Sequence, residues 1–296
     1  MNLSLFRDAG LPALPNRPPD GHKGTFGRTL IVGGSRGMSG APALAGLGAL
    51  RGGAGLVYVA IPQSLAPIVA GIEPSYLTIP LSEDDEGHLA AGAVDRILEQ
   101  VPSMTAIGIG PGLGKSPALR SLVKGVYRTA SLPAVIDADA LNLLSEMREV
   151  LFDPAGPRVL TPHPGEFARL TGQPMEEIQR NREALAVEFA RQHRVVLVLK
   201  GPHTIITDGA RIVLNATGNS GMATGGTGDV LTGLTAALLG QGLPAYEAAR
   251  LGVYLHGLAG DLAAEDLSEH GMIASDLPRY LPKAWLKTQA EARSRR

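Results

Sequence analysis

A regular alternation of short apolar runs and helical segments constrains this fold more than any other feature of the sequence. The runs end in glycine, proline or polar turns, and they are RTLIVGG from residue 28, GLVYVAIP from 55, MTAIGIG from 104, LPAVID from 132, RVLTP from 158 and RVVLVLK from 194. Helical spacing follows several of them, as in SGAPALAGLGALRGG (39–53), a small-residue segment suited to close packing against another backbone. No linker, repeat or low-complexity block divides the chain. The alternation predicts one doubly wound α/β domain in three layers, with helices on both faces of a mostly parallel sheet.

The later part of the chain adds four expected elements. Residues 175–193 predict one long amphipathic helix, in which Ile178, Leu185, Val187 and Phe189 hold apolar positions. A hairpin turning at Asp208-Gly209 follows the strand of residues 194–200, and helices are expected over 229–243 and 245–266. Because sites in doubly wound folds lie beyond the carboxyl ends of the strands, the polar turns at those ends are the candidate site.

Composition and charge exclude several classes of function. The 296 residues carry 27 Lys and Arg against 28 Asp and Glu, so no global field attracts nucleic acid or anionic lipid. The absence of cysteine excludes disulfides, thiolate metal sites and cysteine nucleophiles, and the 7 histidines show no zinc-ligand spacing. The N-terminus lacks the features of a signal peptide, and Arg51 interrupts the most apolar region. We therefore expect a cytoplasmic protein that binds neither nucleic acid nor membrane.

Three familiar fingerprints are nearly matched. IGIGPGLGKS ends like a phosphate-binding P-loop, but Ile109 stands where its first glycine is required. No glycine triplet has dinucleotide-binding G-x-G-x-x-G spacing after a strand. Residues 33–37 satisfy the G-x-S-x-G pattern of a hydrolase nucleophile elbow, a match that a glycine-rich chain readily produces by chance. A hydrolase is therefore a minor alternative.

Polar residues at two strand ends have both structural and functional interpretations. His163 lies between two prolines in TPHPGE, as a structural turn or as a ligand contact. Asp137, Asp139 and Asn142 follow the strand of VIDADALN, where they either cap a helix or hold a water-bridged Mg²⁺ ion.

The stretch NATGNSGMATGGTGDV (215–230) carries the strongest functional signal. Nearly every side chain from Asn215 to Asp229 is small or forms hydrogen bonds, and a helix is expected next. Backbone N–H groups at such a helix start suit a phosphate, and the helix dipole is expected to keep Asp229 ionised beside it. Asp229 is then either a helix cap or a base directed at something bound next to the phosphate.

Together these motifs resemble the ADP- or ATP-dependent NAD(P)H-hydrate dehydratases of the ribokinase-like superfamily. The resemblance covers roughly residues 20 to 285, and it rests on GRTLIVGGS, GIGPGLG, VIDADALN, LTPHPGEFARL, LKGPHT, NATGNSGMATGGTGDVLTG, LHGLAGD and ASDLP, in this order. It implies a ribokinase-like three-layer α/β/α domain over residues 21–288, after an N-terminal extension of residues 1–20. Residues 289–296 are expected to form a solvated basic tail.

The resemblance also implies the chemistry. The substrates are (S)-NADH-hydrate and (S)-NADPH-hydrate, with ADP or ATP as co-substrate, ADP being favoured, and with Mg²⁺. The C6 hydroxyl is phosphorylated first, and phosphate then leaves with electron push from the ring nitrogen. Asp229 would accept the hydroxyl proton, and Gly226, Thr227 and Gly228 would form the anion hole for the transferred group.

Further residues are carried over from the family motifs. Those at hydrate-binding positions are Ala41, Gly112, His163 and Asp229. Those at nucleotide-binding positions are Lys200, Gly201, Pro202, His203, Thr204 and Gly228. Asn142 and Glu166 lie in motifs that organise metal and phosphate in related kinases, and their contact with a metal would be indirect.

Two other functions share the same features. One is a ribokinase-like kinase for a hydroxymethylpyrimidine, thiazole or sugar alcohol, which would use the same base and anion hole. The other is a nucleotide-binding regulator without turnover, although a regulator needs no base. The resemblance further implies a homo-oligomer, often a tetramer, and a separate NAD(P)H-hydrate epimerase, because only some twenty residues precede the first motif.

Overall fold

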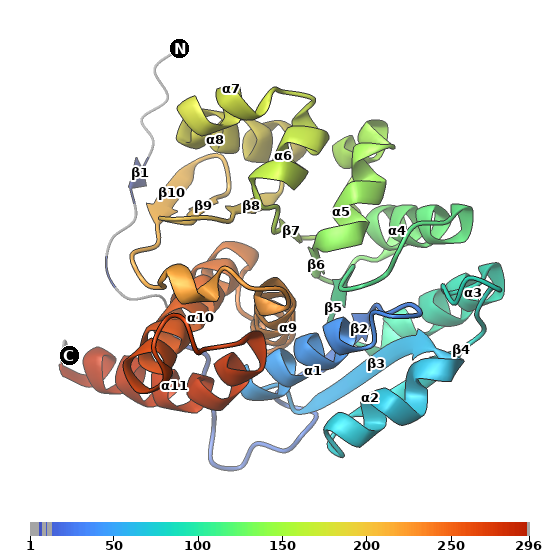
Figure 1. Cartoon of the computed structure of the whole chain (residues 1–296), viewed down its shortest axis with the longest axis horizontal. Helices are drawn as coiled ribbons and strands as arrows, with labels where there is room; N and C mark the ends of the chain where they lie inside the picture. Colours follow the sequence, from blue (N-terminus) through green and yellow to red (C-terminus); the bar gives the residue numbers. More distant parts are fainter. Residues whose placement is uncertain (1–5, 8–9, 11–13, 295–296) are drawn as a thin grey trace.

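A single central sheet organises the chain, as Figure 1 shows. The computed structural model describes residues 6–7, 10 and 14–294. Over these residues the sheet has ten strands in the order β1-β10-β9-β8-β7-β6-β5-β2-β3-β4. β9 is antiparallel to both neighbours, and all other pairings among the described strands are parallel. The predicted mostly parallel sheet is confirmed.

The strands and helices have the following bounds. The strands are β1 Phe6–Arg7, β2 Arg28–Val32, β3 Leu56–Pro62, β4 Leu77–Leu81, β5 Ala106–Ile109, β6 Ala134–Ile136, β7 Arg158–Leu160, β8 Val196–Leu199, β9 Ile205–Thr207 and β10 Arg211–Leu214. The helices are α1 Gly40–Arg51, α2 Ala66–Ile72, α3 Ala91–Gln100, α4 Pro117–Thr129, α5 Ala138–Ser145, α6 Pro164–Thr171, α7 Met175–Arg180, α8 Arg182–His193, α9 Thr227–Gly240, α10 Ala245–Leu267 and α11 Leu277–Ser294.

Two hydrophobic cores lie on opposite faces of the sheet. Successive strand side chains alternate between them, so that Leu30 joins the core of helices α3 to α8 while Ile31 joins the core of α1, α2, α9, α10 and α11. The same two groups of helices lie on the two sides of the sheet in Figure 1. The domain therefore has the predicted three layers.

Glycines bring α1 and α9 into close contact on one face. A side chain at Gly48 would lie 2.2 Å from the carbonyl oxygen of Val230, and one at Gly233 would lie 1.7 Å from that of Ala45. Only glycine permits such an approach of two helix backbones. The expectation that residues 39–53 pack closely against another backbone is confirmed, and this packing fixes α9 next to the sheet.

The structure differs from the expected elements in several places. The predicted helix over residues 175–193 is wrong as one element, because Asn181 has a non-helical backbone (φ −125°) and its side-chain amide donates to Glu177. The chain thus forms α7 and α8 instead. The sequence patterns also did not predict α2, β4, α3 or α11. The expected end of the domain at residue 288 lies inside α11, which continues to Ser294. The hairpin at Asp208-Gly209 is confirmed, with Gly209 at a φ of +87°.

Candidate active site

The site lies at the carboxyl ends of the parallel strands, where a cavity of about 840 Å³ opens. It is lined by the loop after β8, by the loop of residues 215–224, and by the starts of α6 and α9 with one face of α10. The lining residues named in the sequence analysis are His163, Lys200, Gly201, Pro202, His203, Thr204, Thr227 and Gly228. The structure thus brings the predicted nucleotide residues and His163 around one cavity. No helix of the described residues is long and apolar enough to cross a membrane.

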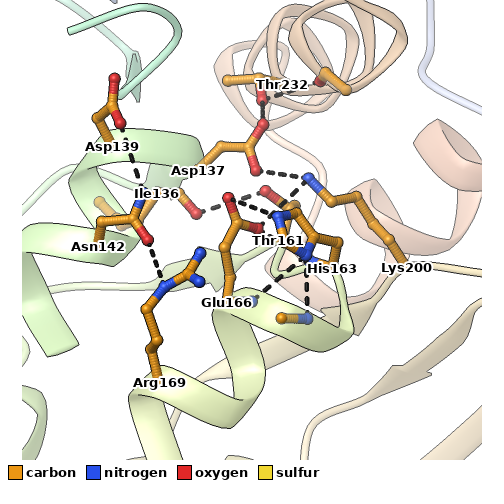
Figure 2. Close-up of polar contacts among 12 residues, drawn as sticks. Ile136, Asp137, Asp139, Asn142, Thr161, His163, Glu166, Arg169, Lys200 and Thr232 are labelled. Carbon is orange, nitrogen blue, oxygen red and sulfur yellow. Dashed lines mark hydrogen bonds and ion pairs between the residues drawn. The ribbon is translucent and has the colours of Figure 1, made fainter. Parts of the chain in front are cut away.

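Lys200 and Asp137 form a buried ion pair beneath this cavity (Figure 2). The Lys200 Nζ donates to Asp137 Oδ1 at 2.8 Å, and the Thr232 hydroxyl donates to Asp137 Oδ2 at 2.7 Å. Burial alone would raise the pKa of Asp137, but the Lys200 charge and these hydrogen bonds outweigh it and lower that pKa. Burial likewise opposes the Lys200 charge, yet the carboxylates around it raise the pKa of Lys200. Lys200 therefore stays positively charged. Its side chain is 21% exposed and lines the cavity, so this charge acts on whatever the cavity binds.

His163 caps α6 with its own ring. Its Nδ1 accepts from the backbone N–H groups of Gly165 (3.0 Å) and Glu166 (3.3 Å), while the Glu166 carboxylate accepts from the His163 N–H at 2.9 Å. Because Nδ1 accepts, the ring proton lies on Nε2. Burial and the charge of Lys200 lower the pKa of His163, which keeps the ring neutral. His163 is thus both a cap and a residue of the cavity wall, so its two sequence interpretations do not exclude each other.

Glu166 is buried between His163 and Lys200. Its Oε1 lies 3.5 Å from His163 Nε2 and its Oε2 lies 3.9 Å from Lys200 Nζ. Burial raises its pKa to about 7, against the opposing effect of Lys200. Glu166 therefore gains or loses a proton near neutral pH.

The start of α9 is built without a side-chain cap. Gly226, the N-cap residue, has a left-handed backbone with a φ of +99°. The Thr227 hydroxyl donates back to the carbonyl groups of Met222 and Thr224 and so fixes the turn. The first turn of a helix leaves its N–H groups without intrahelical acceptors, and those of Gly228 and Asp229 have no partner among the described residues. This turn is therefore free to bind an anion.

Lys200 stands over the same turn of α9. A side chain at Gly228 would lie 3.3 Å from Lys200 Nζ and 3.7 Å from Asp137 Oδ2. The open N–H groups and a fixed ammonium thus converge on the space beside Gly228. Both favour negative charge there.

Asp229 is the third residue of α9 and carries an unusual pKa. Burial, and then the negative charge of Asp137, raise the pKa of Asp229 to about 7, which Lys200 only partly opposes. Burial thus opposes the expected ionising effect of the helix dipole, and at a pKa of about 7 the carboxyl group is partly protonated near neutral pH. A carboxyl group that exchanges its proton near neutral pH suits a general base.

Ala41 and Gly112 lie together, but not among the residues that line the cavity. A side chain at Gly112, whose φ is +60°, would lie 3.0 Å from the Ala41 Cβ. Ala41 lies in the first turn of α1, which follows β2, and Gly112 lies in the loop after β5, at the point where the strand order reverses. A side chain at Gly226 would lie 2.6 Å from Leu44 of α1, so the first turn of α9 reaches from the cavity toward this second region.

Ser35, at the centre of the G-x-S-x-G pattern, is not an exposed nucleophile. Its side chain is buried and its hydroxyl donates to the Gly112 carbonyl oxygen at 2.9 Å. The serine joins the loops after β2 and β5. The hydrolase alternative is therefore wrong.

The acidic groups suit a metal ion that is shared with a bound phosphate. Among the described residues no group of three or more His, Asp or Glu side chains is placed to hold a metal by itself. Asp137, Asp139 and Glu166 nevertheless all raise the pKa of Asp229, so several carboxyl groups lie close together around it. Mg²⁺ commonly keeps several waters and binds one or two carboxylates plus phosphate oxygens. The Asn142 amide oxygen instead accepts from Arg169 Nε at 2.9 Å, as Figure 2 shows.

Sequence reasoning gave no role to α10, although its LHGLAGD motif was part of the resemblance. His256 Nε2 donates to the Thr227 carbonyl oxygen at 2.9 Å. Burial lowers the pKa of His256 to about 4, so the ring stays neutral. The histidine of the LHGLAGD motif was the only signal in the sequence. Its partner Thr227 lies 29 residues away, so local patterns do not pair the two residues.

Comparison with known proteins agrees with this geometry. A family model described as NAD(P)H-hydrate dehydratase matches residues 29–283. A bifunctional NAD(P)H-hydrate repair enzyme of Moorella thermoacetica is 48% identical over 91% of this chain and 51% of its own length. An ADP-dependent (S)-NAD(P)H-hydrate dehydratase of Bacillus subtilis is 37% identical over 96% of this chain and 99% of its own length. The chain spans about half the length of the bifunctional relatives.

Two solved structures are similar over nearly the whole chain. A Bacillus subtilis ADP/ATP-dependent NAD(P)H-hydrate dehydratase, co-crystallized with ATP and Mg²⁺, has a TM-score of 0.79 and 35% identity over 93% of this chain and 94% of that one. A ribokinase-like superfamily protein of Enterococcus faecalis has a TM-score of 0.80 and 29% identity over 93% and 92%. The predicted ribokinase-like fold is thereby confirmed.

Proposed function

Because this chain belongs to the NAD(P)H-hydrate dehydratase family, we propose that it converts (S)-NADH-hydrate and (S)-NADPH-hydrate back to the reduced coenzymes at the expense of ADP or ATP. The observation that carries the proposal is the position of Asp229. A carboxyl group with a pKa of about 7 lies in the same helical turn as N–H groups that are free to bind an anion, and Lys200 stands over that turn. A base and an anion site must adjoin when the atom that attacks a phosphoryl group first loses a proton.

In the first step the C6 hydroxyl of the hydrate attacks the terminal phosphoryl group of the nucleotide. Asp229 accepts the hydroxyl proton as the new O–P bond forms and the phosphoanhydride bond breaks. The N–H groups of the α9 start and the Lys200 ammonium stabilise the charge on the transferred group. ADP then leaves as AMP, or ATP as ADP.

In the second step the C6–O bond breaks and inorganic phosphate leaves, because the ring nitrogen donates its electron pair. Loss of the C5 proton then restores the 5,6 double bond. Hydroxide would be a poor leaving group from the same carbon, which is why the nucleotide is consumed. The net products are the reduced coenzyme, phosphate and the shortened nucleotide.

The cavity of about 840 Å³ is proposed to hold the nucleotide, between the loop of residues 200–204 and the 215–224 loop. The hydrate would lie against Ala41 and Gly112, on the far side of the first turn of α9, and would reach His163 at the wall of the cavity. This places the reacting oxygen between Asp229 and the transferred phosphoryl group. ADP is favoured over ATP because the Bacillus subtilis relative is described as ADP-dependent.

A Mg²⁺ ion bound with the nucleotide would neutralise phosphate charge during the transfer. Glu166 would act on it only indirectly, through water, because its carboxylate is buried 3.9 Å from Lys200 Nζ and is not among the residues that line the cavity. Asn142 would act only through Arg169, which it holds beside Glu166. Tetrameric assembly, a separate epimerase, a cytoplasmic location and the domain limits at residues 20 and 288 stay predictions.

The deciding experiment mixes the protein with NADH-hydrate, Mg²⁺ and either ADP or ATP, and follows the absorbance of reduced nicotinamide. We expect dehydration only with nucleotide present, with AMP or ADP released in equal amount. Dehydration without nucleotide would refute the proposed chemistry. Phosphorylation of a vitamin-precursor alcohol at comparable efficiency would instead establish the kinase alternative, and nucleotide binding without any turnover would establish the regulator.

A further inference from the structure

The 215–224 loop, which forms one wall of the cavity, makes three hydrogen bonds with a single helix, α10. Asp261 of α10 accepts from the backbone N–H of Gly218 at 2.9 Å through Oδ2, and from the Asn219 side-chain amide at 3.1 Å through Oδ1. One carboxylate thus holds two successive residues of the loop. Hydrogen bonds to a charged acceptor are stronger than neutral ones.

The same face of α10 is shaped to receive the loop. The Thr217 hydroxyl donates to the Tyr254 carbonyl oxygen at 3.0 Å. A side chain at Gly257 would lie 2.6 Å from the Thr217 backbone, so only glycine allows the loop to approach this closely. Tyr254, Gly257 and Asp261 are spaced three and four residues apart, which places them on one stripe of the helix.

Asp261 itself is not among the residues that line the cavity, whereas Thr217, Gly218 and Asn219 are. Its effect on a ligand must therefore pass through the loop. Both of its oxygens accept from the loop, so the carboxylate determines where the Gly218 and Asn219 backbone stands relative to the loop of residues 200–204 across the cavity.

We infer that Asp261 is a positioning residue for the nucleotide, which fixes the 215–224 loop in the form that binds ADP or ATP. The inference rests on the proposed function for the identity of the ligand. It assigns no contact with the hydrate, because Ala41 and Gly112 lie on the other side of the α9 turn. The loss of Asp261 should weaken nucleotide binding and leave the hydrate side unchanged.

The test compares Asp261→Ala with Asp266→Ala, a control on the same helix. Asp266 bonds only Tyr280 and Lys283 of α11 in the described structure, away from the loop. We expect Asp261→Ala to raise the Kd for ADP, measured by calorimetry without hydrate, and the KM for ADP by about tenfold. The kcat and the KM for hydrate should stay within about twofold, and Asp266→Ala should bind ADP like wild type.

A second pair of variants, Gly257→Ala and Gly260→Ala, distinguishes an effect on the position of the 215–224 loop from an effect on the stability of α10. Gly257→Ala and Gly260→Ala both raise helix propensity, so neither should unfold α10. The Gly257 substitution meets the Thr217 backbone, while the Gly260 substitution meets the flexible Met222 side chain. We expect the first to weaken ADP binding several-fold more than the second.

Unchanged ADP affinity in Asp261→Ala would overturn the inference, as would equal losses for nucleotide and hydrate. The calorimetric arm needs no turnover. If the wild-type protein binds ADP but does not dehydrate the hydrate, the proposed function fails while the role of Asp261 is still decided.

Discussion

The starts of α6 and α9 lie at the same edge of the sheet, but side chains cap the first helix and leave the second uncapped. In α6 the side chains of His163 and Glu166 satisfy the backbone N–H groups reciprocally. In α9 a left-handed glycine precedes the first turn, and no side chain caps it. Where capping side chains satisfy the backbone N–H groups of a helix start, as in α6, the start serves to position those side chains. A start that is left open beside a fixed cation serves to bind an anion.

The largest expected effect comes from the carboxylate on the open start. Asp229→Asn should lower kcat by at least roughly a hundredfold, because general-base assistance is worth about 10² to 10⁴ in rate. Nucleotide affinity should hold or improve, because a negative charge next to the phosphates is removed. Steady-state kinetics and calorimetry measure the two quantities separately. Near-normal kcat would contradict the base assignment. The cap interpretation of Asp229 is already wrong, because Gly226 is the N-cap residue of α9 and no side chain caps this helix.

The next effect comes from closing the open start. Gly226→Ala places a side chain at a φ of +99°, 2.6 Å from Leu44 and 3.0 Å from Ala274. A left-handed non-glycine residue costs about 1–2 kcal/mol, so we expect a lower free energy of unfolding and about a tenfold loss of kcat/KM, from displacement of the anion hole.

Gly225→Ala is the matched control for this substitution, because a side chain at Gly225 meets nothing within 4 Å. Denaturant unfolding and kinetics of both variants make the comparison. Equal behaviour of the two variants would contradict the special role of Gly226.

Substitutions of His163 separate its two roles at the closed start. His163→Ala should destabilise the protein by about 1 kcal/mol through loss of the cap, whereas His163→Asn should restore most of that stability. Both variants should raise the KM for hydrate several-fold if the ring contacts the substrate. A normal KM in His163→Asn would leave only the capping role.

The pH dependence of activity is a smaller effect that tests Asp229 again. Its pKa of about 7 predicts that kcat/KM rises with pH and levels off above neutrality, because the base must be ionised in the free enzyme. A profile that is flat between pH 5 and pH 8 would contradict the assignment.

The same raised pKa also affects the free energy of unfolding, which should fall with rising pH whereas the activity should rise. The protonated Asp229 favours the folded state, so its contribution is present below the unfolded pKa of about 4 and is lost as pH rises through about 7. Asp229→Asn should therefore gain on wild type by about 4 °C in Tm between pH 5 and pH 8. Thermal unfolding of both proteins over this range measures the difference, and no change with pH would mean that the carboxyl group titrates normally.

The sequence by itself determined the local features and the family. Alternating apolar runs predict the layered sheet because burial of strands and helices follows their periodicity. The hairpin at Asp208-Gly209 is readable because its turn is local, and a structural turn at His163 was one of the two interpretations of TPHPGE. The family motifs predict Asp229, Lys200 and His163 as site residues.

Only the tertiary structure decided how these groups act on one another. Lys200 and Asp137 are 63 residues apart, and Asp261 lies 43 residues from Gly218, so no local pattern pairs them. The raised pKa of Asp229 depends on burial and on the carboxylates of Asp137, Asp139 and Glu166, which oppose the effect expected from the helix dipole. The break at Asn181 is not visible in the amphipathic pattern, which continues through it, because the pattern does not report the backbone angles of a single residue. Periodicity fixes which face of an element is buried, while distances between elements arise only when the whole chain packs.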